Sequence, residues 1–188
     1  MLDKPENTLA GNPAASETGV ALAGIVFAKG NNPDAVFRAV AEACAERGIP
    51  LAGLVQETQA DVPPDCCPPM LVRDVAGKRQ MIISEDRGKE SQGCRLDWGA
   101  LASATEQAET ALRNGAHLLL VNRFGKAESA GQGLRSAIEL AIAEGIPVLA
   151  GIREDYAKDW ETFHGGLATA LPADTDTVLA WLDENTPS

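Results

Sequence analysis

The segment from Leu118 to Glu128 constrains the fold more strongly than any other part of the chain. Residues 118–121 are large and apolar, and residues 122–128 then read NRFGKAE. An uninterrupted apolar run of this kind is typical of a strand buried on both faces of a parallel sheet. Polar and basic residues that follow such a strand lie at the carboxyl edge of the sheet, where ligands of α/β proteins usually bind.

The remainder of the chain alternates apolar strands with helical segments. Residues 20–28 and 49–55 predict two further buried strands, and the helix between them is expected to end at Gly48. Residues 70–75 (MLVRDV) and 79–84 (RQMIIS) flank a short Ala-Gly-Lys turn and predict a β-hairpin. The other predicted elements are a strand over residues 147–152 and helices over residues 97–114, 134–144, 155–163 and 174–183. This order predicts a three-layer α/β fold with a mainly parallel sheet and an inserted β-hairpin.

The length of 188 residues suits a single domain, which we expect over residues 20–184. Residues 1–19 are rich in Asn, Pro, Ser, Thr and Glu, so a disordered extension without a secretory signal is expected there. No apolar run in the sequence is long enough to span a bilayer. Together these features predict a cytoplasmic protein that does not insert into a membrane.

The formal net charge of −11 excludes some classes of partner. Nucleic-acid-binding surfaces need clustered Lys and Arg residues that neutralise phosphates, so no nucleic-acid partner is expected. An anion site on such an acidic chain must be local and built from a few basic side chains.

The loop that follows residues 118–121 is the main candidate for such a site. Arg123 offers a fork of donors suited to oxyanions, Lys126 adds a point charge, and Asn122 and Gly125 allow polar contacts and close approach of the backbone. The helix expected from residue 134 would point its N-terminal amides toward the same edge. The alternative is that Arg123 and Lys126 are surface charges paired with Glu128.

Other strand ends and turns supply secondary candidates. Lys29, Asn31 and Asn32 follow the first strand, which is expected to end beside the strand of residues 118–121, and could complete an anion pocket. A turn with Asn32 or Asp34 as helix cap explains them better. Arg95 could reach the ligand edge, or could belong to the entry of a helix capped by Asp97. The remaining strand ends carry Gln56, Glu57, Arg153 and Glu154.

Three cysteines lie in predicted loops and form the only candidate metal site. Cys66, Cys67 and Cys94 could gather as a thiolate cluster if their loops converge. Adjacent cysteines rarely bind one metal, and neither a Cys-x-x-Cys motif nor a nearby His supports the cluster. Cys44 lies in an Ala-rich helical run and is expected in the core.

The sequence resembles the bacterial DUF2478 family in the order of its elements and in three segments. These are the hairpin of residues 70–84, the helix entry GCRLD at residues 93–97 and the loop NRFGKAE at residues 122–128. The resemblance covers about residues 22–181. That family is similar to the thermophilic nucleoside-triphosphatase family of P-loop proteins, so the resemblance implies a P-loop-NTPase-like fold. Members are often encoded near molybdate-transport or molybdenum-enzyme genes, which implies a link to molybdenum metabolism and partners among those proteins.

The sequence departs from the nucleotide-hydrolysing pattern at two places. A phosphate-binding loop of the form Gly-x-x-x-x-Gly-Lys-Ser/Thr cradles phosphates and binds Mg²⁺. The equivalent turn here, residues 28–34, reads AKGNNPD and lacks the Lys-Ser/Thr pair. The acidic residue expected after the later strand is replaced by Asn122 and Arg123.

The leading hypothesis is therefore an accessory protein, with little or no enzymatic activity, that binds a small anion. Molybdate, another oxyanion or a phosphate-containing ligand would fit this description. The alternatives are a protein that binds or hydrolyses nucleoside triphosphates through atypical motifs, and a protein-interaction module on the same fold. No residue is assigned a catalytic role.

Overall fold

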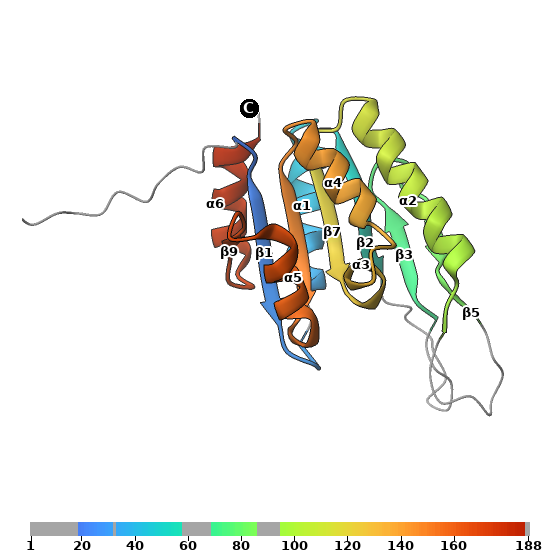
Figure 1. Ribbon diagram of the computed structural model, residues 1–188. Helices are drawn as coiled ribbons and strands as arrows, with labels where there is room; N and C mark the ends of the chain where they lie inside the picture. Colours follow the sequence, from blue (N-terminus) through green and yellow to red (C-terminus); the bar gives the residue numbers. More distant parts are fainter. Residues whose placement is uncertain (1–18, 32, 58–68, 86–94, 187–188) are drawn as a thin grey trace, which may run out of the picture.

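The computed structural model describes residues 19–31, 33–57, 69–85 and 95–186. Its centre is a seven-stranded sheet with the strand order β4-β3-β2-β7-β8-β1-β9 (Figure 1). The strands of this sheet are β1 (Leu22–Phe27), β2 (Leu51–Glu57), β3 (Leu71–Asp74), β4 (Gln80–Ile82), β7 (Leu118–Phe124), β8 (Val148–Arg153) and β9 (Thr169–Ala170). Two short strands, β5 (Ser84–Glu85) and β6 (Arg95–Leu96), pair separately.

The helices connect these strands in the alternating pattern that the sequence predicts. They are α1 (Asp34–Glu46), α2 (Trp98–Arg113), α3 (Lys126–Ser129), α4 (Arg135–Ala143), the 3-10 helix η1 (Glu154–Tyr156), α5 (Ala157–His164) and α6 (Thr175–Asn185). The short elements α3, β5, β6 and β9 were not predicted, because segments of two to four residues carry too little periodicity to be recognised.

The pairing of the strands confirms a mainly parallel sheet with an inserted hairpin. Strands β2, β7, β8, β1 and β9 run parallel, and the hairpin β3–β4 joins β2 in antiparallel pairing. Strand β8 lies between β1 and β7, so the loops after β1 and β7 are not at neighbouring strand ends, contrary to the expectation from the sequence.

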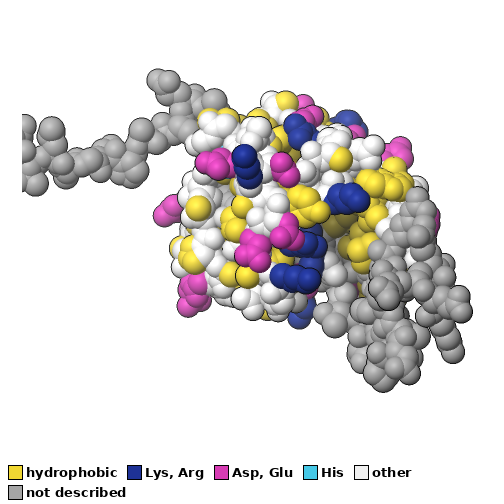
Figure 2. All heavy atoms as spheres, turned by 60° about the horizontal axis from the view of Figure 1, so that its bottom comes forward, with side chains coloured by type: hydrophobic (Ala, Val, Ile, Leu, Met, Phe, Trp, Pro, Cys, Tyr) yellow, Lys and Arg dark blue, Asp and Glu magenta, His cyan; other side chains and the backbone are white. Residues whose placement is uncertain are grey.

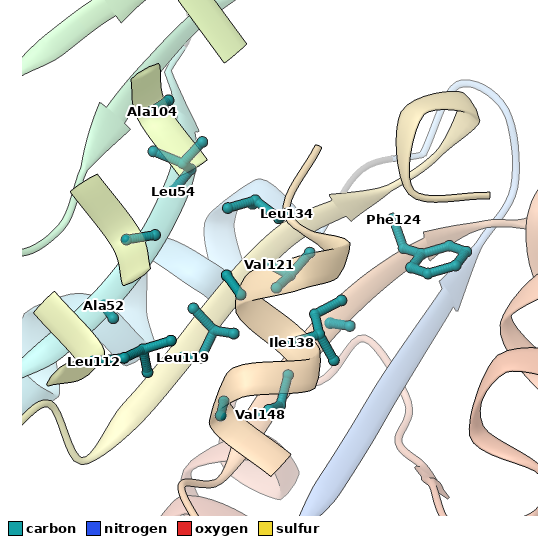
Figure 3. Packing of buried hydrophobic residues seen from close by; sticks show 14 of the residues in the cluster. Ala52, Leu54, Ala104, Leu112, Leu119, Val121, Phe124, Leu134, Ile138 and Val148 are labelled. Carbon is teal, nitrogen blue, oxygen red and sulfur yellow. The ribbon is translucent and has the colours of Figure 1, made fainter. Parts of the chain in front are cut away.

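Alternate side chains of the strands enter two separate cores. Leu54, Leu119 and Val121 face the layer that contains α2, α4 and α5. Figure 3 shows Leu119 beside Leu112 of α2 and Val121 beside Ile138 of α4. Leu118 and Leu120 face the opposite core, which α1 and α6 cover. Figure 1 shows α2, α4 and α5 in front of the sheet and α1 behind it, so the fold has the predicted three layers.

One helix entry agrees with the predicted cap, and another differs. Asp97 accepts a hydrogen bond from the backbone amide of Ala100, as predicted, and Asp174, for which no cap was predicted, accepts one from the amide of Thr177. At α1 the N-cap position is Pro33, without a capping side chain, and Asp34 is the first helical residue. The expectation that Asp34 caps this helix was wrong, because its carboxylate is used elsewhere.

Strand β7 is also longer than the apolar run that predicted it. The strand continues through Phe124, and its register against β8 shifts between Val121 and Phe124. Asn122 and Arg123 therefore lie within an irregular strand end rather than in a loop. Irregularities of this kind redirect side chains at the rim of a sheet.

No helix among the described segments is long and apolar enough to cross a bilayer. The expected disorder of residues 1–19 concerns a segment of which only Gly19 is described.

Gly53 offers a test of the contact between β2 and β7. Its φ is +109°, and a Cβ atom at this position would overlap the backbone carbonyl of Leu120 on β7. We expect Gly53→Ala to lower the free energy of unfolding by about 3 kcal/mol or more, because both the backbone conformation and the strand spacing oppose it. Gly115→Ala is the matched control, since Gly115 has a φ of +94° but no atom within 4 Å of the added Cβ. Equal losses for both variants in chemical denaturation would show that the contact between strands is unimportant.

Candidate anion-binding site

A buried polar cluster joins the end of β7 to the start of α1. The side-chain amide of Asn122 donates a 2.8 Å hydrogen bond to Oδ1 of Asp34, and Nη2 of Arg123 lies 3.4 Å from Oδ2 of the same carboxylate. Asp34 is only 5% exposed and Asn122 only 3%, so this contact lies inside the protein. The Arg123 guanidinium also stacks over the Phe27 ring, 5.7 Å from its centroid. The contacts with Asp34 and Phe27 therefore fix the Arg123 side chain, and Asp34 partly neutralises its charge.

Asn122 and Arg123 each have one buried side-chain atom without a partner in the described part of the chain. Neither Oδ1 of Asn122 nor Nε of Arg123 forms a hydrogen bond with a described residue, although both atoms are buried. Buried polar atoms without partners cost free energy, roughly 1–3 kcal/mol each, and are uncommon in folded proteins. The polar cluster is therefore not fully satisfied by the described residues.

In the described part of the turn between β1 and α1, two backbone amides already have acceptors. The backbone amide of Lys29 donates to the carboxylate of Glu154 at 3.1 Å, and the amide of Asn31 donates to the carbonyl of Ala28. Asp34 and Glu154 thus place carboxylates on this turn. Anions are repelled by such an arrangement, whereas a phosphate-binding loop attracts them through unpaired amides.

The buried carboxylate of Glu128 holds the loop after β7 through hydrogen bonds to its backbone. Its carboxylate accepts hydrogen bonds from the amides of Gly125 at 3.0 Å and Leu134 at 3.1 Å, and it is only 5% exposed. Burial raises the pKa of this carboxyl group above its ordinary value of 4.5. The predicted alternative, in which Glu128 pairs with Arg123 and Lys126, was wrong because Glu128 bonds to the backbone. The N-terminus of α4 is likewise not the expected anion site, since Glu128 already accepts from Leu134 at its N-cap position.

A cavity of about 810 Å³ opens beside this loop, toward β2 and the hairpin. Four of the predicted ligand-binding residues, Asn122, Arg123, Gly125 and Lys126, line it together. Arg153 from the end of β8 adds a third cation to the lining. Lys126 is exposed and has no ion pair among the described residues, whereas Arg153 pairs with Asp155. Figure 2 views the edge of the sheet that contains the strand ends and shows Lys and Arg side chains gathered beside a hydrophobic area.

The other predicted site residues are not part of this cavity as the structure describes it. Lys29 and Asn31 are exposed on the β1–α1 turn and do not line the cavity, and Arg95 lies in β6, where its backbone alone is described. Asn32 and the three candidate metal ligands Cys66, Cys67 and Cys94 lie outside the described residues. Within the described ranges, no group of three or more His, Cys, Asp or Glu side chains could hold a metal ion. Cys44 is in the core as expected, and burial raises the pKa of its thiol to about 11.

Three features of the site were not predicted from the sequence. The first is the pair of Asp34 and Arg123, which are 89 positions apart and are brought together only by the packing of the turn over β8. The others are Trp98 and Tyr156, which line the cavity. Trp98 directly follows the capping residue Asp97, and a large aromatic residue at such an exposed helix start was a usable signal.

Glu128 provides a test of how the loop is held. Replacing it with Gln puts an amide donor opposite one of the two backbone amides, so Glu128→Gln should lower the free energy of unfolding by about 1–3 kcal/mol. Because the pKa of Glu128 is raised in the folded state, its stabilising contribution is complete below the unfolded pKa and is lost as the pH rises through the folded pKa. The difference in stability between wild type and variant should therefore narrow as the pH rises from 4 toward neutral. Denaturation across this pH range measures it, with the exposed Glu139→Gln as control, and a difference that widens with pH would contradict the assignment.

Comparisons with known proteins agree with this architecture. The chain is 31% identical over 160 residues to the molybdenum import ATP-binding protein ModC 2 of Bradyrhizobium diazoefficiens, a match that spans 85% of this chain but only 18% of that protein. The crystal structure of THEP1 from the hyperthermophile Aquifex aeolicus superimposes with a TM-score of 0.57 at 12% identity, covering 87% of this chain and 95% of THEP1. The fold is thus the P-loop-NTPase-like fold that the sequence resemblance implied. The model of the family described as "Protein of unknown function (DUF2478)" matches residues 22–181, so the chain belongs to the DUF2478 family.

Proposed function

We propose that this protein binds a small anionic ligand at the carboxyl edge of its sheet, in the cavity beside the β7–α3 loop. The observation that carries the proposal is the convergence of Arg123, Lys126 and Arg153 on one cavity of a chain whose net charge is −11. Cations gathered in a concave site raise the local potential and select anions even when the whole molecule is acidic. Lys126 contributes a charge without an acidic partner among the described residues, and Arg123 offers a planar donor group.

Nucleotide hydrolysis through the usual phosphate loop does not fit the residues present. The β1–α1 turn carries the carboxylates of Asp34 and Glu154 where phosphates would lie, and its sequence has no Lys-Ser/Thr pair. The end of β7 carries Asn122 and Arg123 in place of an acidic Mg²⁺ ligand. Each departure removes a different part of the machinery, so we assign no hydrolytic step. Nucleotide binding without turnover remains the second candidate, because the fold is that of a P-loop NTPase.

The proposed biological setting is molybdenum handling. One relative of this chain is a molybdenum import ATP-binding protein, and the present chain corresponds to about a fifth of its length. A small domain of this kind could act as an accessory to molybdate transport or to molybdenum enzymes, with molybdate or a related metabolite as ligand. We place this role in the cytoplasm, where such an accessory would meet the imported anion.

The binding test uses a charge-matched pair of double variants. Isothermal titration and thermal shift would be measured with molybdate, tungstate, sulfate, inorganic phosphate, ATP and GTP, with and without Mg²⁺. Removing two charge-assisted contacts should weaken anion binding at least tenfold in Arg123→Ala/Lys126→Ala. The control Arg113→Ala/Lys158→Ala changes the net charge equally at exposed positions that do not line the cavity.

The outcomes separate the alternatives. Binding that is lost in the cavity variant but kept in the control supports the anion site. Equal affinity in all three proteins, or no binding of any anion, contradicts it. Phosphate release from ATP or GTP that depends on Mg²⁺ would instead establish an active nucleotide hydrolase.

Asp34 should compete with the ligand for Arg123. We expect Asp34→Asn to strengthen anion binding several-fold, because the variant removes the negative charge that lies 3.4 Å from the Arg123 guanidinium. The same change should lower the melting temperature, since it weakens a buried ion pair. Asp176→Asn, at an exposed position in the first turn of α6, controls for the change in net charge. Weaker anion binding in Asp34→Asn than in wild type would show that Asp34 positions Arg123 rather than competing for it.

A further inference from the structure

The cavity beside the β7–α3 loop has two chemically different ends. Its cations come from the end of β7, from α3 and from the end of β8, as described above. Its opposite wall comes from β2, the hairpin and the entry to α2, and all of that wall except Gln56 is apolar. The strand order β3-β2-β7-β8 fixes this separation, because it places the hairpin and β8 on opposite sides of β7.

The apolar wall is more extensive than an inorganic anion needs. It is formed by Leu54, Met70, Val72, Leu96, Trp98 and Leu101. The whole cavity has a volume of about 810 Å³, which is within the range of roughly 300–1,000 Å³ that is typical of sites for organic ligands. A bare tetrahedral oxyanion would contact only the cationic end and would leave the apolar wall in water.

Trp98 is the residue of this wall that most clearly indicates a ligand. It is 42% exposed, whereas Trp160 and Trp181 are 4% and 8% exposed in the two cores. Trp98 is the first residue of α2, and Asp97 fixes the start of that helix by accepting from the amide of Ala100. An exposed indole ring at this capped helix start offers a flat apolar surface on which another ring can stack.

We infer that the ligand is an organic phosphate with a planar ring, whose phosphate contacts Arg123, Lys126 and Arg153 while its ring lies against Trp98. This inference rests on the proposed anion site and specifies the class of ligand that the site accepts. The ring would replace water on the apolar wall, and the phosphate would meet the cations at the other end. The site is separate from the β1–α1 turn, so it requires neither a phosphate-binding loop nor Mg²⁺.

The test compares ligands that carry one or both of these parts. Adenosine monophosphate and flavin mononucleotide carry a ring and a phosphate, adenosine and riboflavin carry only the ring, and inorganic phosphate and molybdate carry only the anion. We expect at least one ring-bearing phosphate to bind roughly tenfold tighter than inorganic phosphate, the gain that one stacked ring typically provides. Binding of that ligand should quench the fluorescence of Trp98.

Variants of Trp98 separate stacking from general packing. Trp98→Ala should remove the roughly tenfold ratio between the affinities for the ring-bearing phosphate and for inorganic phosphate, and Trp98→Phe should keep most of that ratio. Leu167→Ala is the matched control, because Leu167 is similarly exposed at 46% and does not line the cavity. Circular dichroism and melting temperature would verify that each variant is folded.

Each outcome has a definite meaning. A ring advantage that disappears in Trp98→Ala and persists in Leu167→Ala supports the inference. Equal affinity for ring-bearing and inorganic phosphate, or no effect of Trp98→Ala, overturns the inference and leaves the anion site intact. If adenosine or riboflavin binds as tightly as its phosphate, or if no anion binds, the proposed anion site fails and the inference fails with it.

Discussion

The contact of Asp34 with Asn122 and Arg123 is the interaction on which the geometry of the carboxyl edge of the sheet depends. It ties the start of α1 to the end of β7 across the intervening strand β8. Gly151 of β8 makes this crossing possible, because a Cβ atom there would lie 2.5 Å from the carbonyl oxygen of Asn122 and 3.2 Å from the ring of Pro33. The polar contact and the glycine beneath it together position the turn, the strand end and the Arg123 guanidinium.

This arrangement moves the cationic part of the edge away from the first strand. In the turn after β1, the carboxylates of Asp34 and Glu154 engage Arg123 and the backbone of Lys29. Arg123, Lys126 and Arg153 line the cavity beside the β7–α3 loop, where the hairpin and α2 supply an apolar wall. A scaffold shared with P-loop NTPases thus presents its polar groups to a different part of the same sheet edge.

Patterns along the chain predicted the long elements because each has its own local cause. The apolar run at Leu118 predicted a buried strand, and Asp97 capped its helix as its position indicates. The same local reasoning offered Asn32 or Asp34 as the cap of α1, and the structure corrected the choice of Asp34, because a distant arginine and asparagine bind its carboxylate. Similarly, Glu128 was a plausible partner for Arg123 by proximity in sequence, yet its burial and two backbone donors decided otherwise.

The sequence by itself determined the layers, the parallel strands, the inserted hairpin and the basic character of the loop after β7, because periodicity and turn chemistry are local properties. Only the tertiary structure decided which charges meet. The order of the strands placed β8 between β1 and β7. The packing of helices on both faces of the sheet determined which carboxylates are buried and which cations line the cavity. Burial and charge pairing depend on residues that are far apart in the chain, so no single segment can reveal them.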